Sequence, residues 1–489
     1  MAEELPLKVA SEGRLQLIVP ASGQPIGEVQ VSRGTSGRGS WLEDAGERER
    51  LVDVSFAVDW WRWRDLEIAF MPNSDGSIEL HLSGPWAEEA PGVIFRQEIL
   101  WDGLEAQGTE ILNGDFASMD GWESPWRSAL TADQWPIEGR ELAASWHGRP
   151  LVQQLKVKAG REVRITLKAR AAVVPGYVEP VKLKGKTAAH RANSLMKRGV
   201  NLGNCWEAPP GSWGIRYDVS DIDRIAAAGF DHVRVPVAWH FHMEGGKISP
   251  AFLKELEPVL RRALEKKMIV MLNWHHFDDL TSDPDGKLGA FVGGWRAVAA
   301  HFADWPSGLY FELLNEPKGE LGGSKLNEVH AATIGAIRAI SAERIIVVNP
   351  GRWATTNALG ELHLPDGDDR IIVSVHCYAP FEFTHQGAEW VDLEHVKGVE
   401  FPGNLPLLYE QELDDAVAWS KHFGRPVHLG EFGAYSTADI ESRRRYARAL
   451  RKAAEARGIP WCWWEWKAGF GCWDGEKNEP ILIRELMGE

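Results

Sequence analysis

Two glutamates in this sequence of 489 residues stand where carboxylates could do chemistry. Glu316 lies in "FELLNEPKG", where an apolar strand-like run ends in an amide and a carboxylate and proline prevents its continuation. Glu431 lies in "HLGEFG", after a second apolar run. When two carboxyl groups lie close together, one can be protonated while the other is ionised, because their environments separate the two pKa values. Cleavage of a glycosidic bond requires such a pair.

Other polar and aromatic residues also follow apolar runs, at what would be strand ends. They are Asn204 and Glu207 in "GNCWE", Arg234 in "HVRVPV", His275 and His276 in "NWHH", Asn315 beside Glu316, His376 and Tyr378 in "HCY", and Trp464 and Glu465 in "WWEW". In a parallel barrel, working groups lie where strands end and loops begin. Arg234 is expected to keep one carboxylate ionised, because a nearby cation lowers a carboxylate pKa.

The sequence predicts no metal site and no cofactor. His275 and His276 lack the i, i+4 spacing of helical zinc ligands, so contacts with sugar hydroxyls are the expected role of both. The four cysteines form no CxxC pair, and free thiols packed as small hydrophobes are preferred over a disulfide, which stays open as an alternative.

From residue 197 onward, strand-like runs alternate with helical stretches. Eight apolar runs, from "GVNLG" to "PWCWWEW", are separated by segments such as "AFLKELEPVLRRALEKK". Eight units without a glycine-rich phosphate fingerprint favour a (β/α)₈ TIM barrel over a doubly wound sheet. The stretch at 350–366 is the least helical. A barrel would place Glu316 and Glu431, after strands 4 and 7, across one mouth.

Residues before the barrel have a different pattern. Runs such as "LVDVSFAV" and "VRITLKARA" alternate with period two between turn residues, which predicts an all-β jelly-roll or sandwich domain at 1–175. Residues 176–196 mix Pro, Gly and Lys, as a linker does. The expected organisation is therefore multidomain: a sandwich, a linker and a catalytic barrel at 197–489.

Tryptophan is unusually frequent, with 24 residues against 7 tyrosines. Indole rings suit surfaces that are half apolar and half polar, as sugars are. "NGDFASMDGWES" resembles the opening of a carbohydrate-binding jelly roll, although the segments that resemble its closing half come first, which suggests a permuted or fused sandwich. Core packing is the alternative role for the tryptophans there, which are Trp60, Trp61, Trp63, Trp86, Trp122, Trp126, Trp135 and Trp146.

The formal net charge of −16 argues against nucleic acid or an anionic membrane as the partner. No run of eighteen apolar residues predicts a transmembrane helix. The start, "MAEELPLKVASEG", lacks a signal-peptide pattern. We expect a secreted monomer whose signal peptide is absent from this chain, with an intracellular protein as the alternative.

Residues 197–489 resemble the cellulase family, glycoside hydrolase family 5, and most closely its bacterial endoglucanase and mannanase branch. The segments that carry the resemblance are "NLGNCWEAP", "HVRVPVAW", "LNWHHFDDL", "FELLNEPKG", "SVHCYAPFEFTHQGAEW", "RPVHLGEFGAYSTADIESR" and "WWEWKAGFGCWD". The resemblance implies a TIM barrel that hydrolyses polysaccharide by a retaining double displacement, with Glu316 as general acid/base and Glu431 as nucleophile.

The resemblance also implies substrate contacts for the other residues. Asn315 would bond the 2-hydroxyl of the sugar at the cleavage point, and Trp464 would lie beneath that sugar. Three residues would orient the nucleophile: Arg234, His376 and Tyr378. Contacts on the non-reducing side would come from Asn204, Glu207, His275, His276 and Glu465, and Trp390 would stack on the leaving-group side.

The expected function is a retaining endo-β-1,4-glucanase, with β-mannan or glucomannan as further substrates. A β-mannanase, a xyloglucanase or a β-1,3-glucanase of the same fold are the alternatives within the class. An alternative from another class is a polysaccharide-binding protein without catalysis, which the intact pair of glutamates disfavours.

Overall fold

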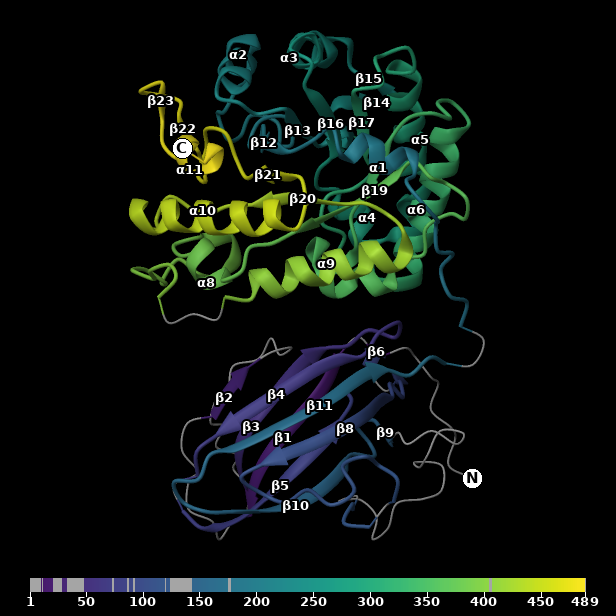
Figure 1. The fold of residues 1–489 in the computed structure, drawn as a ribbon. Coiled ribbons are helices and arrows are strands. Elements are labelled where there is room, and N and C mark those ends of the chain that lie inside the picture. Colours follow the sequence, from purple (N-terminus) through teal and green to yellow (C-terminus); the bar gives the residue numbers. More distant parts are fainter. Residues whose placement is uncertain are drawn as a thin grey trace. The chain divides into compact units, whose positions relative to one another are not determined.

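The chain divides into two compact units, residues 1–178 and 179–489. The structure is a computed structural model, shown in Figure 1, and it describes residues 10, 12–20, 29–32, 48–72, 74–85, 88–90, 93–118, 120–123, 143–174, 177–403 and 407–488. Three of the tryptophans considered above lie outside the described residues: Trp86, Trp126 and Trp135.

The elements described in the first unit are strands. Two larger sheets have the orders β10-β5-β1-β3 and β2-β4-β11-β8-β9, and β6 pairs with β7. All of these neighbours are antiparallel. The strands are β1 (Glu12–Pro20), β2 (Val29–Ser32), β3 (Arg48–Ala57), β4 (Arg64–Phe70), β5 (Gly76–Ser83), β6 (Glu88–Ala90), β7 (Val93–Ile94), β8 (Ile99–Gln107), β9 (Ala143–Ser145), β10 (Leu151–Val157) and β11 (Val163–Ala171).

The tryptophans described in this unit have different surroundings. Trp60 and Trp122 are buried. Trp61, Trp63 and Trp146 are half-buried, and the guanidinium groups of Arg62 and Arg170 lie over the rings of Trp61 and Trp63. At least part of the tryptophan content therefore belongs to the core, as the alternative interpretation held.

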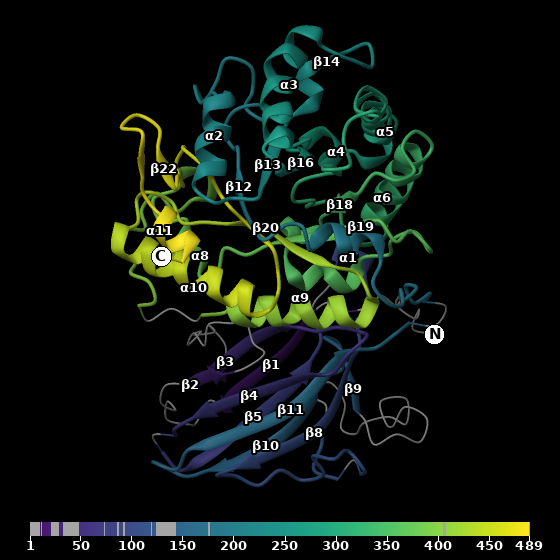
Figure 2. The same ribbon diagram turned by 45° about the horizontal axis from the view of Figure 1, so that its top comes forward.

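The second unit is built on a closed barrel of eight parallel strands, as the sequence predicts (Figures 1 and 2). Their order is β12 (Arg198–Asn201), β13 (His232–Val237), β16 (Ile269–Trp274), β17 (Leu309–Glu312), β18 (Ile346–Val348), β19 (Ile371–His376), β20 (Val427–Phe432) and β21 (Trp461–Trp463). The last strand is shorter than the run "PWCWWEW", because Trp464 already lies beyond it. Every barrel strand except β12 is buried along its full length, which fits strands covered by helices on one face and filled by side chains on the other.

Helices connect the strands and surround them. The α-helices are α1 (Ala188–Asn193), α2 (Val219–Ala227), α3 (Pro250–Glu265), α4 (Asp278–Ser282), α5 (Pro284–His301), α6 (Gly323–Arg338), α7 (Gly351–Ala354), α8 (Phe381–Thr384), α9 (Tyr409–Phe423), α10 (Ile440–Ala456) and α11 (Ile483–Met487). The 3₁₀ turns are η2 (Trp239–His242), η3 (Thr356–Glu361) and η4 (Glu389–Val391), and short pairs join β14 (Met243–Glu244) with β15 (Lys247–Ile248) and β22 (Trp473–Asp474) with β23 (Glu479–Pro480). The stretch at 350–366 contains only the short α7 and η3, as expected.

Local sequence explains where the long helices begin. Asp218 caps α2 by accepting hydrogen bonds from the backbone of Ser220 and Asp221, and Ser249 and Asp439 do the same for α3 and α10.

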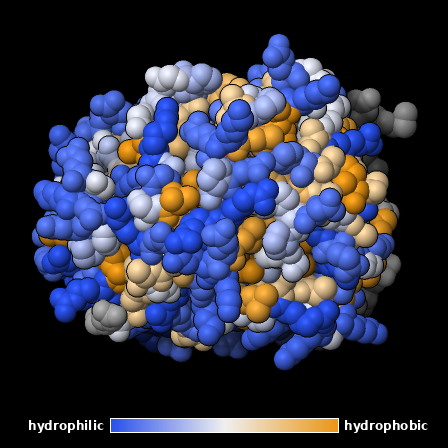
Figure 3. All heavy atoms as spheres, turned by 90° about the horizontal axis from the view of Figure 1, so that it is seen from above, coloured by the Kyte–Doolittle hydropathy of each residue, from blue (hydrophilic) through white to orange (hydrophobic). Residues whose placement is uncertain are grey.

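Figure 3 shows the face that carries α2 and α3 in Figure 1, where hydrophobic side chains form small groups among hydrophilic ones. These are amphipathic helices that turn one side toward the strands.

The segment before the barrel contributes to its interior. Helix α1, within the stretch expected to be a linker, places Ala189 and Ala192 in one apolar cluster with side chains near the amino ends of four strands. The other members of this cluster are Met196, Ile269, Met271, Tyr310, Ile345, Val347 and Ile372. This cluster closes the end of the barrel opposite the candidate site.

The four cysteines, Cys205, Cys377, Cys462 and Cys472, are free and buried, which confirms the preference for packed thiols. Among the described residues, no helix combines the length and the apolar character needed to cross a bilayer.

Candidate active site

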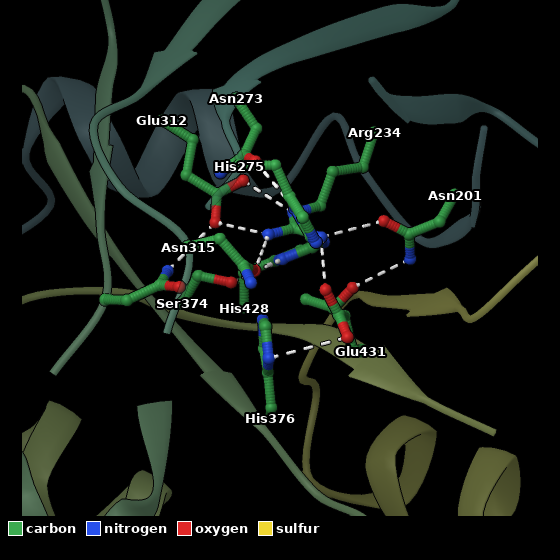
Figure 4. Close-up of polar contacts among 12 residues, drawn as sticks. Asn201, Arg234, Asn273, His275, Glu312, Asn315, Ser374, His376, His428 and Glu431 are labelled. Atoms are coloured by element: carbon green, nitrogen blue, oxygen red, sulfur yellow. Dashed lines mark hydrogen bonds and ion pairs between the residues drawn. The ribbon is translucent and has the colours of Figure 1, made fainter. Parts of the chain in front are cut away.

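Arg234 occupies the centre of the site, on β13 (Figure 4). Its side chain is fully buried, and it donates to Glu312 from Nε (2.6 Å) and Nη2 (3.0 Å) and to Glu431 from Nη1 (2.6 Å). Nη1 and Nη2 also reach the amide oxygens of Asn201 (2.9 Å) and Asn315 (2.7 Å). Burial lowers the pKa of Arg234, but the two carboxylates outweigh it and raise the pKa. One cation on β13 therefore holds residues from three other strands or their ends, β12, β17 and β20, in fixed positions.

Glu431 lies at the end of β20 and is buried. Besides the bond from Arg234, it accepts one from the phenolic hydroxyl of Tyr378, 2.8 Å from Oε2. His376 Nδ1 lies 3.7 Å from the same oxygen. Both hydrogen-bond partners of this carboxylate are donors, so its oxygens are oriented toward them and fixed.

Glu316 follows β17 and keeps 24% of its side chain exposed. Its Oε1 lies 2.7 Å from His376 Nδ1, and its backbone N–H donates to Asn349 Oδ1 at 3.1 Å. The backbone of Glu316 has a φ of +46°, and Asn204 and His276 also adopt positive φ, at 64° and 53°. Such conformations cost ~1–3 kcal/mol in residues with side chains and cluster at functional sites.

The structure brings the two glutamates together. One carboxylate oxygen of Glu316, one of Glu431 and a ring nitrogen of His376 all lie within 4.8 Å of one another. Figure 4 shows Glu431 between Arg234 and His376. The pair faces one space at the barrel mouth, where the sequence analysis placed it.

Two further carboxylates organise the loops beside this space. Glu207 accepts from the backbone N–H groups of Asn204 and Cys205, and Glu465 accepts from those of Ala468 and Phe470, each at 3.0 Å. Burial raises the pKa of Glu207 to about 7 and that of Glu465 to about 8. Backbone donors oppose these shifts, so the loops after β12 and β21 are tied to buried carboxyl groups.

Aromatic rings form another part of the site. Trp464 stacks on His275, with ring centroids 5.4 Å apart and planes 9° apart. His275 is buried, with Nδ1 3.0 Å from Asn273 Oδ1, whereas His276 is exposed. Trp390 is 60% exposed on the long loop after β19. These positions are compatible with ring faces that contact a ligand, which was the role expected of Trp464 and Trp390.

Residues 194–469 match the protein family described as Cellulase (glycosyl hydrolase family 5). The chain belongs to glycosyl hydrolase family 5. Curated relatives include Endoglucanase H of Acetivibrio thermocellus, 31% identical over 286 residues, which are 58% of this chain. The Cellulase/esterase CelE of the same organism is 30% identical over 297 residues, and the match covers 55% of this chain. The chain spans only 30% and 35% of the lengths of these two relatives.

Solved structures of family 5 proteins cover the same part of the chain. An endoglucanase is 38% identical with a TM-score of 0.59, and the match covers 62% of this chain and all of that one. Cel5A of Thermotoga maritima in complex with cellobiose is 36% identical, with a TM-score of 0.59 and coverage of 61% and 98%. The same protein in complex with mannotriose is 35% identical, with a TM-score of 0.58 and coverage of 60% and 99%.

In this family 5 site, the ring of His376 lies close to both glutamates, 2.7 Å from Glu316 and 3.7 Å from Glu431. Burial raises the pKa of Glu431 and outweighs the lowering effects of His376 and Arg234. Burial also acts on Glu316, but the hydrogen bond and charge of His376 outweigh it and lower the pKa. His376 can lower the pKa of Glu316 in this way only when its imidazole ring is positively charged. A neutral His376 whose Nδ1 accepts would favour the protonated form of Glu316 instead.

Two groups of side chains in the family 5 barrel could also be considered as metal ligands. Among the described residues, Glu316, His376 and Glu431 form one group, and the ligand atoms of His232, His428 and Cys462 form another within 4.8 Å. In both groups, hydrogen bonds within the protein already use most of the atoms that an ion would need. Neither group requires a metal to explain its geometry.

Several residues of the site were missed by the sequence analysis. Glu312 is fully buried against Arg234, and Asn349 Nδ2 donates to it at 2.9 Å. Asn201 donates to the backbone oxygens of Gly430 (3.0 Å) and Trp463 (3.2 Å), which ties three strands together. A charged residue inside the apolar run "LYFELL" was a usable signal for Glu312, because a buried carboxylate needs a partner.

Proposed function

We propose that the protein is a retaining endo-β-1,4-glucanase, with Glu316 as general acid/base and Glu431 as nucleophile. The supporting observation is the separation of less than 4.8 Å between oxygens of these two residues. Retaining glycosidases hold their carboxyl groups ~5–5.5 Å apart, whereas inverting ones need ~6.5–9.5 Å to accommodate a water molecule. The short distance supports direct attack on the sugar by one carboxylate.

The surroundings of the two glutamates support this division of roles. Arg234 and Tyr378 donate to Glu431, and both contacts favour the ionised form needed for attack on the anomeric carbon, in opposition to burial, which raises the pKa of Glu431. Glu316 is more exposed and has only His376 as its side-chain partner among the described residues. It can therefore protonate the leaving oxygen, and then take a proton from the water that hydrolyses the glycosyl-enzyme intermediate.

Asn315 is proposed to bind the 2-hydroxyl of the sugar at the cleavage point. Its Oδ1 accepts from Arg234, which leaves its amide N–H groups to face the substrate. Trp464, supported by the stacked ring of His275, is proposed as the platform beneath that sugar. Contacts from Asn204, Glu207, His276 and Glu465 on the non-reducing side and from Trp390 on the other side remain predictions from the resemblance.

β-Mannan is proposed as a second substrate. The specific observation is the similarity to a solved structure that binds mannotriose as well as cellobiose, at 35–36% identity. Glucose and mannose differ in the orientation of the 2-hydroxyl, so tolerance of both depends on the contacts near Asn315.

Product analysis on carboxymethylcellulose, barley β-glucan, a linear β-1,3-glucan, glucomannan, mannan and xyloglucan tests the proposal. We expect internal cleavage of β-1,4-glucan, with the β-anomer formed first as seen by NMR. Initial formation of the α-anomer would contradict retention, and binding without release of reducing ends would favour a non-catalytic protein. Activity on β-1,3-glucan alone would contradict the substrate assignment.

For the first unit, we propose a carbohydrate-binding-module-like β-sandwich. The four- and five-stranded antiparallel sheets support a sandwich, and the half-buried Trp61 and Trp63 are its candidate sugar contacts. A full-length Glu431→Gln protein carrying Trp61→Ala and Trp63→Ala should bind insoluble cellulose more weakly than Glu431→Gln alone. Unchanged binding would assign these rings a structural role. We also propose that the protein is secreted, because an insoluble polysaccharide is encountered outside the cell. A monomer is the expected oligomeric state.

A further inference from the structure

One side of the barrel interior contains a row of polar side chains that catalysis by two glutamates does not require. Asp231 lies before β13, His232 on β13, His428 on β20 and Ser374 on β19. The last three are completely buried. Barrel interiors are usually filled by branched apolar residues, and buried polar groups are costly unless they are paired. Two histidines and a serine in this place therefore need an explanation.

The contacts form a chain. His232 Nδ1 lies 2.7 Å from Asp231 Oδ1, His232 Nε2 lies 3.1 Å from His428 Nε2, and Ser374 Oγ lies 3.4 Å from His428 Nδ1. The last contact is longer than an ideal hydrogen bond. The chain runs along the barrel from the amino ends of the strands toward the mouth.

The direction of these hydrogen bonds follows from Asp231. This carboxylate also accepts from the backbone of Lys197 and Arg198, and His232 and these donors lower its pKa against the effect of burial. His232 must then donate from Nδ1, which leaves its Nε2 as an acceptor in the neutral ring. His428 must donate from Nε2, so its Nδ1 accepts and the hydroxyl of Ser374 donates. Burial lowers the pKa of His428, which favours the neutral ring that this pattern needs.

The open end of the chain lies on the same side of Gly430 as His376. Its Nε2 is buried and has no hydrogen-bond partner among the residues that the structure describes. A Cβ on Gly430 would lie 2.4 Å from Ser374 Oγ and 3.0 Å from His376 Nε2, so both atoms border the same glycine. Gly199 makes room in the same way lower down, where a Cβ would lie 2.3 Å from His232 Nε2. The lone pairs of Ser374 Oγ are thus available to His376 Nε2–H through one bridging water.

We propose that Asp231, His232, His428 and Ser374 are positioning residues that hold His376 in the tautomer with Nε2 protonated and Nδ1 accepting. The protonated carboxyl group of Glu316 then donates a hydrogen bond to Nδ1, and Glu316 keeps its proton for the role of general acid. This inference rests on the proposed function, since it assigns the acid role to Glu316. His376 is the group through which the chain acts, and the chain itself touches neither substrate nor reacting atoms.

Other charged and titratable groups face the chain and His376, and all of them enter the pH dependence. His428 faces Arg234 and His232 from β13, Cys462 from β21 and His376 from β19. His376 faces Glu316, Glu431, His275 and His428. Substitution within the chain leaves these groups in place, and Ser374→Ala removes no charge at all.

The test is the pH dependence of kcat/KM for Ser374→Ala. Without the acceptor, His376 is free to protonate Nδ1, which stabilises ionised Glu316, so the basic limb should move to lower pH by roughly one unit. KM should change little. The loss of kcat should be several-fold on an aryl β-cellobioside with a poor leaving group and negligible with a good one, because only the former needs acid assistance.

Thr333→Val is the matched control, since it removes another fully buried hydroxyl, on α6, which donates to the backbone oxygen of Val329. It should leave the pH profile unchanged. An unshifted basic limb in Ser374→Ala, or an equal shift in both variants, would overturn the inference. His428→Leu should shift the limb in the same direction as Ser374→Ala. If His428→Leu does not fold, Ser374→Ala decides.

A direct readout does not depend on activity. In the wild-type protein labelled with ¹⁵N-histidine, we expect the His376 resonances of a neutral ring protonated at Nε2, and a change toward Nδ1 protonation in Ser374→Ala. A ring protonated at Nδ1 in the wild type would overturn the inference.

If the wild type cleaves no β-glucan, the proposed function fails. If the wild type is active and the pH profile does not change in Ser374→Ala, only the positioning chain is refuted.

Discussion

The two sides of the barrel interior differ sharply, although the same eight strands build both. Met271, Tyr310 and Val347 on β16 to β18 are buried in an apolar cluster closed by α1. Strands β13, β19 and β20 carry Arg234, Ser374 and His428, which are equally buried but hydrogen-bonded. Arg234 and Met271 are even paired in register on adjacent strands. At the amino ends of the strands, apolar packing and polar contacts are therefore divided between two sides of the barrel, whereas nearer the mouth β17 itself contributes Glu312 to the contacts of Arg234.

Replacement of Arg234 by Met should have the largest effect on the polar side. The change leaves Glu312 and Glu431 buried without their cation, which we expect to cost about 3–5 kcal/mol in the free energy of unfolding. The pKa of Glu431 should rise further, so kcat/KM should fall at least ~10²-fold through loss of the ionised nucleophile. Urea denaturation and initial rates on β-glucan measure the two effects. Unaltered activity would contradict the assignment of Arg234 to the catalytic, polar side of the barrel interior.

Met271→Ala is the counterpart on the apolar side. It should destabilise the protein by about 2–5 kcal/mol, because it removes a fully buried side chain and leaves a cavity. Below the unfolding transition, kcat and KM should stay within about twofold of the wild type, since the site itself is anchored by other residues. A large loss of kcat in the folded protein would show that the two sides are not separate.

A smaller effect is expected at His330, on α6 outside the barrel interior. This histidine is buried, both ring nitrogens lack a partner among the described residues, and burial lowers its pKa to about 3. The unfolded chain binds the proton more tightly, so stability is lost as the pH falls from about 6.5 toward 3. His330→Leu should therefore gain about 2 kcal/mol relative to the wild type at pH 5 compared with pH 8.

The exposed His395 provides the control for this measurement. Thermal or urea unfolding at both pH values should show the gain for His330→Leu and not for His395→Leu, because the first variant replaces a buried ring and the second an exposed one. An equal gain in both variants would contradict the assignment to buried His330.

Sequence alone predicted the barrel because its strands and helices alternate in the sequence. It predicted the strand ends because polar residues follow the apolar runs there. The eight apolar runs and the polar residues that follow them, such as Asn315 and Glu316, were recognisable without coordinates. The inner polar layer was not predicted: Asn201, Ser374 and His428 lie within strands, and a sequence does not reveal which face of a fully buried strand points inward. Helix α1 was missed because its six residues are too few for a helical period.

The central claim is that Glu431 attacks the sugar while Glu316 assists. An activated 2-deoxy-2-fluoro-β-cellobioside should trap the glycosyl-enzyme intermediate, because the fluorine slows its hydrolysis. Peptide mapping by mass spectrometry should then locate one sugar adduct on Glu431, and the adduct should be absent from Glu431→Gln. An adduct on another residue, or turnover without any covalent intermediate, would contradict the account.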